Sequence, residues 1–339
     1  MKTVSTLAIL FIFQSTSLAQ SNMKPSYVDI TQKDTILTAY GPEDMLLDTS
    51  GVNPRLIISC GDFRNVKKIN RRGAIYSYDL RTGVSAPFSV EGFDSKNLFP
   101  HGISLMASNQ AKLYVINHGS DNKKENNEIL VFTIKDNVLR LDTLLKDPCL
   151  TTPNDLFVLP DGSFYVSNEG GLSVGALLSR LFSRPSNVVY FDAATSSFRK
   201  AYRKVTVANG LHAIGGKLYV VDAFKKKLLV LNIAANRSLT LNSKIKVSKG
   251  LDNISVSQAG DKLYIPAHDN VFKLNATRKK QGRLSPFSVY EIDLHTSNVT
   301  KLISNNGSLI SAVSTASVSE QHLYLSQIFD NYILKLKLN

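Results

Sequence analysis

The chain has 339 residues, of which 43% are hydrophobic and 20% charged, a composition typical of a globular protein and long enough for one large all-β domain or two average ones. Its net charge of +13 would suit a nucleic-acid partner, but the basic residues are scattered in small groups, there is no Trp, and no basic stripe is interleaved with aromatic residues. The composition therefore argues against nucleic-acid binding and favours solvated basic loops, with an anionic or lipid surface as the alternative.

The first residues have the pattern of a secretory signal. Residues 1–19 combine a positive start at Lys2, a short apolar core from Val4 to Phe13, and the small-x-small site Ser17-Leu18-Ala19. The apolar core has about ten residues, whereas a membrane-spanning helix needs about twenty. We predict a cleavable signal peptide and an extracellular protein, with an uncleaved anchor as the alternative.

Cysteine usage and glycosylation sequences fit that compartment. The chain holds only two cysteines, Cys60 and Cys149, so the fold cannot depend on a disulfide framework, and one bridge or two free thiols both remain open. Asn-x-Ser/Thr sequences, which would suit a secreted glycoprotein, occur at Asn236, Asn275, Asn298 and Asn306.

A short apolar strand pattern, often with a central Tyr, recurs six times at a spacing of about fifty residues, which is typical of propeller blades. The copies are Leu56-Ile57-Ile58, Leu113-Tyr114-Val115, Phe164-Tyr165-Val166, Leu218-Tyr219-Val220, Leu263-Tyr264-Ile265 and Leu323-Tyr324-Leu325. Each precedes a second apolar or alternating run: Ile75 to Leu80, Ile129 to Ile134, Val188 to Phe191, Leu228 to Ile233, Val289 to Leu294 and Ile333 to Leu338. We therefore predict that residues 20–339 form a single all-β domain, a six-bladed β-propeller.

Each repeat opens with a polar-then-apolar segment that would form the innermost strand of its blade and line the central tunnel. The openings are Glu43-Asp44-Met45, His101-Gly102-Ile103, Asn154-Asp155-Leu156, Asn209-Gly210-Leu211, Asp252-Asn253-Ile254 and Ser311-Ala312-Val313. The last repeat reaches Asn339 without a fourth strand, so we expect Asp29 to Tyr40 to pair with it and close the ring.

One segment breaks the strand pattern. Gly175 to Arg184 carries Leu177, Leu178, Leu181 and Phe182 at helical spacing, which predicts a short amphipathic helix over the top face. It would either pack on the propeller or act as a lid or membrane-facing patch.

The repeat openings supply oxygen ligands suited to calcium. Their side chains include Glu43, Asp44, Asn154, Asp155, Asn209, Asp252 and Asn253, with no cysteine among them. Four carboxylates in a narrow tunnel would repel one another, which favours two calcium ions over one. Because neighbouring residues on a strand point opposite ways, pairs such as Glu43-Asp44 could serve an upper and a lower site together. Any one of these residues could equally be an ordinary turn residue, and only their recurrence favours ligation.

Two histidines belong to the second repeat. His101 lies at its opening and His118 ends its core strand, so antiparallel pairing would bring them together at the tunnel mouth. They would form either a catalytic pair that activates water or two hydrogen-bonded core histidines.

With these residues in place, the sequence resembles the paraoxonase family of secreted calcium-dependent hydrolases of lactones and aryl esters, which is related to gluconolactonase and strictosidine synthase propellers. The resemblance spans most of the mature chain. Its carriers, in order, are Gly41-Pro42-Glu43-Asp44, Pro100 to Ser104, Val115 to His118, Asn154-Asp155, Ser186 to Tyr190, Ala208-Asn209-Gly210, Asp252 to Ser255 and Ser314 to Val318.

The resemblance implies roles for individual residues. Catalytic calcium would be held by Glu43, Asn154, Asn209, Asp252 and Asn253, and structural calcium by Asp44, Asp155 and the Ile103 backbone carbonyl. His101 and His118 would be the catalytic pair, and His268 and Val207 would contact substrate.

Two departures from the family accompany this resemblance. The family's cysteines near the two termini have no counterpart, so ring closure would rely on strand pairing, and Ala267 replaces the cysteine beside the pocket histidine. The expected function is a calcium-dependent lactonase or arylesterase acting on a small-molecule ester. The alternatives are a non-catalytic, calcium-stabilised binder of a hydrophobic ligand or lipid, and a lyase of the strictosidine synthase type.

Overall fold

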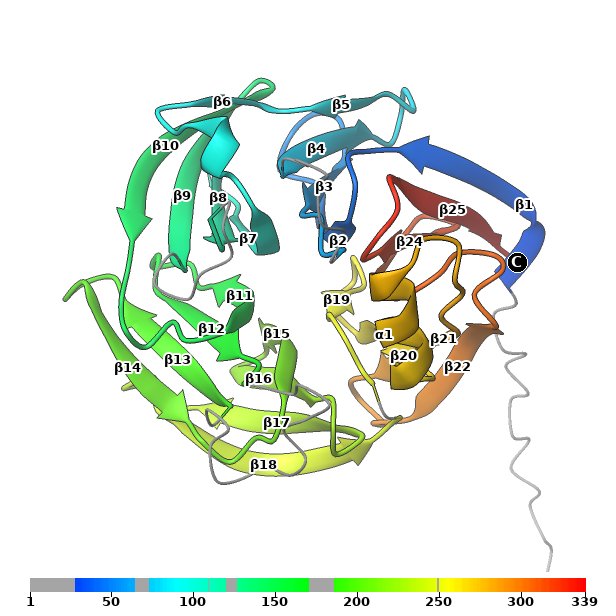
Figure 1. The fold of residues 1–339 in the computed structure, drawn as a ribbon. Helices are drawn as coiled ribbons and strands as arrows, with labels where there is room; N and C mark the ends of the chain where they lie inside the picture. The colour runs from blue at the N-terminus through cyan, green and yellow to red at the C-terminus, as the bar shows by residue number, and fades with distance from the viewer. Residues whose placement is uncertain (1–27, 65–72, 109, 120–126, 171–185, 249) are drawn as a thin grey trace, which may run out of the picture.

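The computed structural model describes residues 28–339 except 65–72, 109, 120–126, 171–185 and 249. These residues form six sheets arranged around a central axis like the blades of a propeller (Figure 1). The predicted six-bladed all-β architecture is confirmed. The predicted signal peptide and the predicted helix at 175–184 lie outside the described residues.

In every blade the strands follow one another from the tunnel outward, apart from the outermost strand of blades 2 and 6, which comes from an earlier part of the chain. Blade 1 contains β2 (Pro42–Asp48), β3 (Arg55–Cys60), β4 (Ala74–Asp79) and β5 (Ser85–Pro87). Blade 2 contains β7 (Pro100–Met106), β8 (Lys112–Asn117), β9 (Glu128–Lys135), β10 (Val138–Leu145) and, parallel to β10 at the outer edge, β6 (Ser89–Glu91). Blade 3 contains β11 (Pro153–Val158), β12 (Phe164–Asn168), β13 (Asn187–Asp192) and β14 (Ser197–Tyr202).

The second half of the chain repeats this arrangement. Blade 4 contains β15 (Ala208–Ile214), β16 (Lys217–Asp222), β17 (Lys227–Ile233) and β18 (Leu239–Lys246). Blade 5 contains β19 (Ser255–Val256), β20 (Lys262–His268), β21 (Phe287–Asp293) and β22 (Val299–Asn305). Blade 6 contains β23 (Val313–Ser319), β24 (His322–Gln327), β25 (Tyr332–Leu338) and β1 (Val28–Leu37).

Most of the core consists of six apolar layers, one between each pair of neighbouring blades, and a small seventh cluster contains Ala312, Ile328 and Phe329. For example, Leu218 and Val220 of β16 pack with Tyr165 of blade 3. Both faces of a blade are covered, which explains why the second strands are apolar runs rather than alternating ones. Each fully buried Leu or Ile contributes about 1.5–3 kcal/mol, so these layers fix the spacing of the blades around the tunnel.

Ring closure follows the prediction for Asp29 to Tyr40. Strand β1 pairs antiparallel with β25, with Ile36 opposite Ile333, and Gly41 N–H donates to the Asp330 carbonyl at 2.9 Å. The first described strand thus covers the edge left by the last one.

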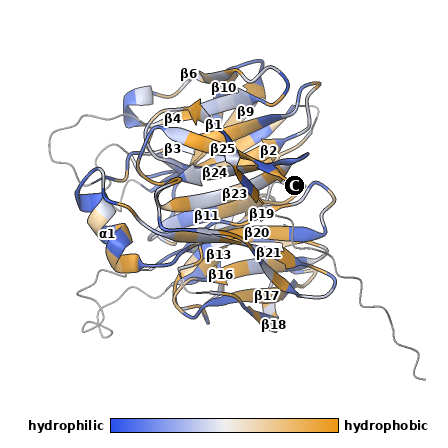
Figure 2. Ribbon diagram, turned by 90° about the vertical axis from the view of Figure 1, so that its right-hand side faces the viewer, coloured by the Kyte–Doolittle hydropathy of each residue, from blue (hydrophilic) through white to orange (hydrophobic). Residues whose placement is uncertain are grey.

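A single α-helix occurs among the described residues, and it is not the predicted one. Helix α1 (Val271–Lys279) connects β20 to β21 on one flat face of the propeller (Figure 2). The Asn270 side chain caps it by accepting from Lys273 N–H at 3.0 Å, and Arg64 Nη1 donates to the Thr277 carbonyl near its end at 3.3 Å.

Both cysteines are free thiols, Cys60 buried in β3 and Cys149 partly exposed, which settles the alternative left open by the sequence. Within the described residues, no helix has the length and apolarity needed to cross a membrane.

Candidate active site and cation sites

Irregular strand pairing marks the upper end of every innermost strand. In β2, Pro42 pairs with Cys60 and Asp44 with Ser59, so Glu43 is an extra residue without a partner. Equivalent shifts, each with two residues opposite one, separate Pro100 from Ile103, Pro153 from Leu156, Ala208 from Leu211 and Val313 from Ala316. In blade 5, Leu251 bridges Ala267 and regular pairing resumes at Ser255.

The bulges contain Glu43, His101, Asn154, Asp155 and Asn209, whereas Asp252 and Asn253 lie in the irregular segment between Leu251 and Ser255. A bulge bends its strand and re-aims side chains, so here the two levels of the tunnel arise from bulges. This differs from the regular alternation expected from the sequence.

Glycines allow neighbouring bulges to approach closely. A Cβ on Gly102 would lie 2.5 Å from the Asn154 carbonyl oxygen and 2.6 Å from Asp155 Cα. A Cβ on Gly210 would lie 2.6 Å from the Asp252 carbonyl oxygen. Only glycine leaves room for the backbones of consecutive blades to meet at this level.

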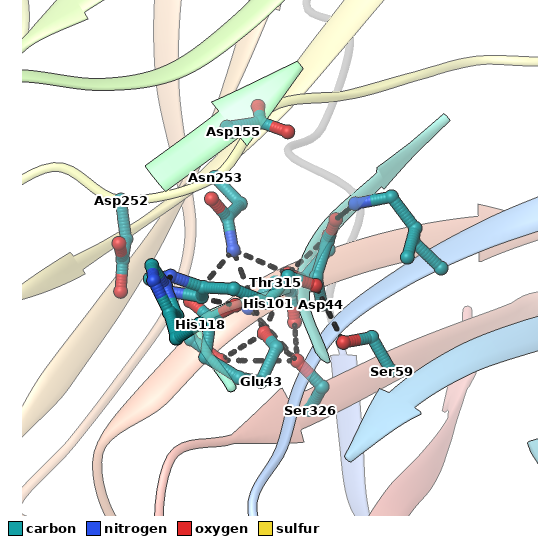
Figure 3. A network of polar contacts seen from close by, with 12 residues as sticks. Glu43, Asp44, Ser59, His101, His118, Asp155, Asp252, Asn253, Thr315 and Ser326 are labelled. Atoms are coloured by element: carbon teal, nitrogen blue, oxygen red, sulfur yellow. Dashed lines mark hydrogen bonds and ion pairs between the residues drawn. The ribbon is translucent and has the colours of Figure 1, made fainter. Parts of the chain in front are cut away.

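The upper level of the tunnel contains four buried side-chain oxygens that accept no hydrogen bond: Glu43 Oε2, Asn154 Oδ1, Asn209 Oδ1 and Asn253 Oδ1. Asn253 is oriented by its amide group, because Nδ2 donates to Glu43 Oε1 at 3.0 Å and to Thr315 Oγ1 at 3.1 Å (Figure 3). A buried acceptor without a partner costs about 1–3 kcal/mol. Four of them on four different blades, all of types that bind hard cations, fit a calcium ligand set.

The remaining predicted upper residue, Asp252, is paired with His268. Nε2 of His268 lies 2.7 Å from Asp252 Oδ2, and both side chains are buried. The structure therefore brings the predicted substrate-contacting histidine against a predicted calcium ligand.

The lower level is formed by Asp44 and Asp155. Asp44 Oδ2 accepts from Ile103 N–H at 2.8 Å, and its Oδ1 accepts from Met45 N–H at 2.8 Å. Asp155 accepts from Leu156 N–H at 2.7 Å and Leu211 N–H at 2.8 Å. Ile103 thus contacts this pair through its amide, and the predicted role of its carbonyl stays a prediction.

Mutual proximity and burial disfavour ionisation of these carboxyl groups. Burial, followed by the charge of Glu43, raises the pKa of Asp44 to about 7. Burial, then the charge of Asp44, raises the pKa of Asp155 well above its usual range, and burial followed by the charge of Asp252 does the same to the pKa of Glu43. A bound cation would remove the repulsion and allow all three to ionise.

The described residues contain no group of three or more His, Cys, Asp and Glu side chains arranged to hold a metal ion. Each level instead has two carboxylates, Glu43 with Asp252 above and Asp44 with Asp155 below. A cation at either level would therefore depend on amide or backbone oxygens as well.

The two histidines are in contact, as their strand positions predict. His101 Nδ1 lies 2.9 Å from His118 Nε2, and His118 Nδ1 lies 2.8 Å from Asn127 Oδ1. Asn127 Nδ2 donates to the carbonyls of Leu150 at 3.1 Å and Thr151 at 3.3 Å. Because these carbonyls require the amide nitrogen, Asn127 Oδ1 must face His118.

This orientation determines where the protons lie. Asn127 Oδ1 accepts from His118 Nδ1–H, so Nε2 of neutral His118 is the acceptor for His101 Nδ1–H. Neutral His101 then presents its Nε2 lone pair 3.4 Å from Glu43 Oε2. Burial lowers the pKa of His101, and burial together with the charge of His101 lowers the pKa of His118 to about 4, so both rings are neutral at pH 7.

The match to a known family adds to this geometry. Residues 65–334 match the arylesterase family. The chain belongs to that family. It is 26% identical over 273 residues to serum paraoxonase/arylesterase 2 of Canis lupus familiaris, covering 77% of this chain and 75% of the relative. It is also 26% identical over 269 residues to human serum paraoxonase/lactonase 3, covering 76% of this chain and 75% of the relative.

Solved structures similar to this arylesterase-family chain share its fold. A putative gluconolactonase superposes with a TM-score of 0.59 at 12% identity, covering 95% of this chain and 97% of the other. A gluconolactonase from Xanthomonas campestris gives a TM-score of 0.56 at 14% identity, covering 94% and 96%.

Not every residue of this arylesterase-family site could be read from the sequence. Val207 is buried just before β15, and its contact with substrate stays a prediction. Asn127 and Thr315 were not among the predicted site residues. Asn127 belongs to no motif, and Thr315 lies in the segment Ser314 to Val318, which carries the family resemblance but had no role assigned to it. Glu169 was also missed: its pKa is raised by burial, and the positive charge of a protonated His101 would oppose that shift.

Proposed function

We propose that this protein is a calcium-dependent hydrolase of lactones and aryl esters, with His101 as the general base. One observation carries the proposal: four unpaired buried oxygens lie at the level where His101 presents its Nε2 lone pair beside Glu43. The names of the similar paraoxonases, arylesterase and lactonase, support the substrate class.

Calcium at the upper level would be held by Glu43, Asn154, Asn209, Asp252 and Asn253, and a second ion by Asp44, Asp155 and Ile103. When bound, the upper ion supplies a Lewis acid that polarises the ester carbonyl and stabilises the negative charge that develops on its oxygen. Each unpaired oxygen would gain a partner on ion binding, which offsets the cost of its burial. Ligation would also engage Glu43 Oε2, leaving His101 Nε2 to face a water molecule.

The histidine pair then performs the proton transfers. His101 Nε2 removes a proton from water as the water oxygen bonds to the carbonyl carbon. The positive charge on the His101 ring is stabilised by its Nδ1–H bond to His118, whose own orientation is held by Asn127. Cleavage of the carbon–oxygen bond returns the proton to the leaving alkoxide or phenoxide. The products are a carboxylic acid and an alcohol, joined in one molecule when the substrate is a lactone.

We also propose that the protein acts outside the cell, because the signal-like residues 1–19 accompany similarity to proteins named as serum enzymes. Its partner at the site is a small-molecule ester or lactone, and association with a lipid surface is a further proposal from the sequence.

The decisive test is hydrolysis of a panel of lactones and phenyl acetate by the purified protein, with calcium and after chelation. We expect turnover that chelation removes and added calcium restores. His101→Gln should lower kcat/KM by about 10²–10⁴-fold, the usual contribution of a general base. His295→Gln, on an exposed turn outside the tunnel, should match the wild type.

Absence of turnover together with strong thermal stabilisation by calcium would contradict this function. It would favour the alternative in which the ions only pin the blades and the propeller binds a hydrophobic ligand or lipid. Equal activity of the His101→Gln and His295→Gln variants would exclude His101 as the base.

A further inference from the structure

A cavity of about 360 Å³ occupies the lower half of the tunnel, at the ends of the innermost strands opposite the histidine pair. Its lining includes Asp44, Ile103 and Asp155 and none of the five upper-level residues. Its outer end is bounded by the exposed residues Ser50, Ala107 and Gln258, so it reaches solvent on the lower face. The lower carboxylates therefore open toward the face away from His101.

Above these carboxylates, hydrogen bonds link the three neighbouring blades 5, 6 and 1 at the wall of the tunnel. Asn253 Nδ2 contacts Glu43 of blade 1 and Thr315 of blade 6 (Figure 3). Thr315 Oγ1 lies 3.0 Å from the Glu43 carbonyl oxygen and 3.1 Å from Asp44 Oδ1, either of which can accept its single proton. These buried side chains lie between the two levels, and none of the five upper-level residues lines the lower cavity.

The charge of the cavity differs from that of the whole protein. Three aspartates, Asp44, Asp48 and Asp155, lie among the described lining residues, which include no Lys or Arg. Asp48 is paired with Arg55 Nε at 2.9 Å, so Asp44 and Asp155 supply the carboxyl groups without a basic partner. The chain as a whole has a net charge of +13. His212 in the wall is neutral, since burial lowers its pKa to about 4, and hydroxyl groups such as that of Ser255 supply further polar surface. The lining thus offers a cation two carboxyl groups that it can ionise, and no basic side chain competes with it there, although the chain as a whole is positively charged.

We propose that the lower half of the tunnel is a cation channel, through which the divalent ion at Asp44 and Asp155 enters and leaves independently of the upper mouth. The inference depends on the proposed calcium binding and adds a route to it. A substrate occupying the upper mouth would leave this route open, and the two ions would exchange through opposite faces of the propeller.

The test measures calcium uptake directly. In an Asp252→Asn background, which weakens the upper site, uptake of radioactive calcium by the metal-free protein reports on the lower site. Leu105 lines the cavity and is half-buried, so Leu105→Lys places a positive charge in the channel and Leu105→Gln is the matched neutral change. At low ionic strength we expect the lysine variant to take up calcium about tenfold more slowly than the glutamine variant, with the difference shrinking as salt rises.

A control pair places the same side chains on the other face. Phe272 of α1 is 78% exposed near the upper mouth, and Phe272→Lys and Phe272→Gln should take up calcium at the same rate. The opposite pattern, with a slow Phe272→Lys and equal Leu105 variants, would overturn the channel.

Unmutated protein gives a second measurement that does not depend on folding of the variants. Entry through an acidic channel predicts slower uptake as salt is added, whereas entry across a basic surface predicts faster uptake. Faster uptake would reject the proposal. Calcium uptake without ester hydrolysis would reject the hydrolase function, and the uptake rates would still decide the channel. If the protein bound no calcium at all, both the hydrolase function and the channel would be overturned.

Discussion

At the scale of single residues, the basicity of His101 depends on a side chain that does not touch it. Asn127 is held by two backbone carbonyls and orients His118, which in turn leaves the His101 lone pair free. A histidine base needs a partner that selects its tautomer, and here an amide takes the place of the carboxylate often found in that position.

Substitutions at Asn127 separate this positioning role from packing. Asn127→Leu removes the acceptor for His118 Nδ1–H, so we expect kcat/KM to fall by about 10–100-fold. Asn127→Asp keeps an acceptor and adds a negative charge that stabilises the imidazolium, so the acid limb of the kcat/KM profile should move to higher pH. Profiles of both variants on one lactone test this. An unchanged acid limb in Asn127→Asp would show that Asn127 acts only in packing.

The sequence could predict the histidine pair but not Asn127. His101 lies in the bulge of β7 and His118 directly follows β8, on either side of the Pro100–Asn117 pair, so the pairing of these two strands brings them close. Asn127 precedes β9, and its contact with His118 depends on the course of a connection that no periodic pattern describes. The calcium ligands were predictable because they recur at blade openings. Their division between two levels depends on bulges, which arise only when the partner strands are present.

At the scale of elements, the close packing of inner strands depends on glycine at two bulges. Gly102→Ala would place a methyl group 2.5 Å from the Asn154 carbonyl oxygen, against backbone atoms that cannot move aside. We expect unfolding free energy to fall by about 1–3 kcal/mol, the usual cost of overpacking. Denaturant unfolding in saturating calcium checks this. Gly51→Ala is the control, because its nearest atom would be 3.9 Å away, and an equal loss in both variants would contradict the packing argument.

Strand elements were easier to predict than helix α1. The apolar runs recur in every repeat. Because both faces of a blade are buried, these runs form strands whatever the secondary-structure propensity of their individual residues. Helix α1 has only one buried residue, Thr277, and no continuous apolar stripe, so its pattern resembles a loop. Its Asn270 cap was a readable signal, but a capping residue without an apolar face does not predict a helix. Contacts from Arg64, distant in sequence, stabilise it.

At the scale of the whole molecule, ring closure brings buried acids from different blades together. Glu43 and Asp44 come from blade 1, Asp155 from blade 3 and Asp252 from the segment that opens blade 5. In the unfolded chain only the adjacent residues Glu43 and Asp44 would be close to each other. Folding therefore opposes their ionisation unless a cation is present. The stability of the closed ring is thereby linked to calcium and to pH.

The sign of this linkage follows from the direction of the pKa shifts. Carboxyl groups lose their protons near pH 4 in the unfolded chain. The folded metal-free protein retains the proton of Asp44 up to a pKa of about 7, and the pKa values of Glu43 and Asp155 are raised well above their usual range. Folded protein then binds more protons, so its stability falls as pH rises. The lowered pKa values of His101, His118 and His212 act in the opposite direction, but only up to the unfolded histidine value of about 6.5.

Above that pH the carboxyl groups act alone. We expect the unfolding free energy of chelated protein to fall between about pH 6.5 and 8, by up to about 1.4 kcal/mol per pH unit for each titrating carboxyl. Asp44→Asn removes the group that loses its proton near pH 7, so it should flatten the fall up to about that pH. Saturating calcium should abolish it, because the ions favour the ionised carboxylates and bind only the folded state. Thermal or urea unfolding across this range, with chelator and with calcium, measures both effects. A chelated protein whose stability is constant or rises from pH 6.5 to 8 would show that the two levels of carboxylates are not destabilised by their mutual repulsion, and the electrostatic case for cations in the tunnel would fail.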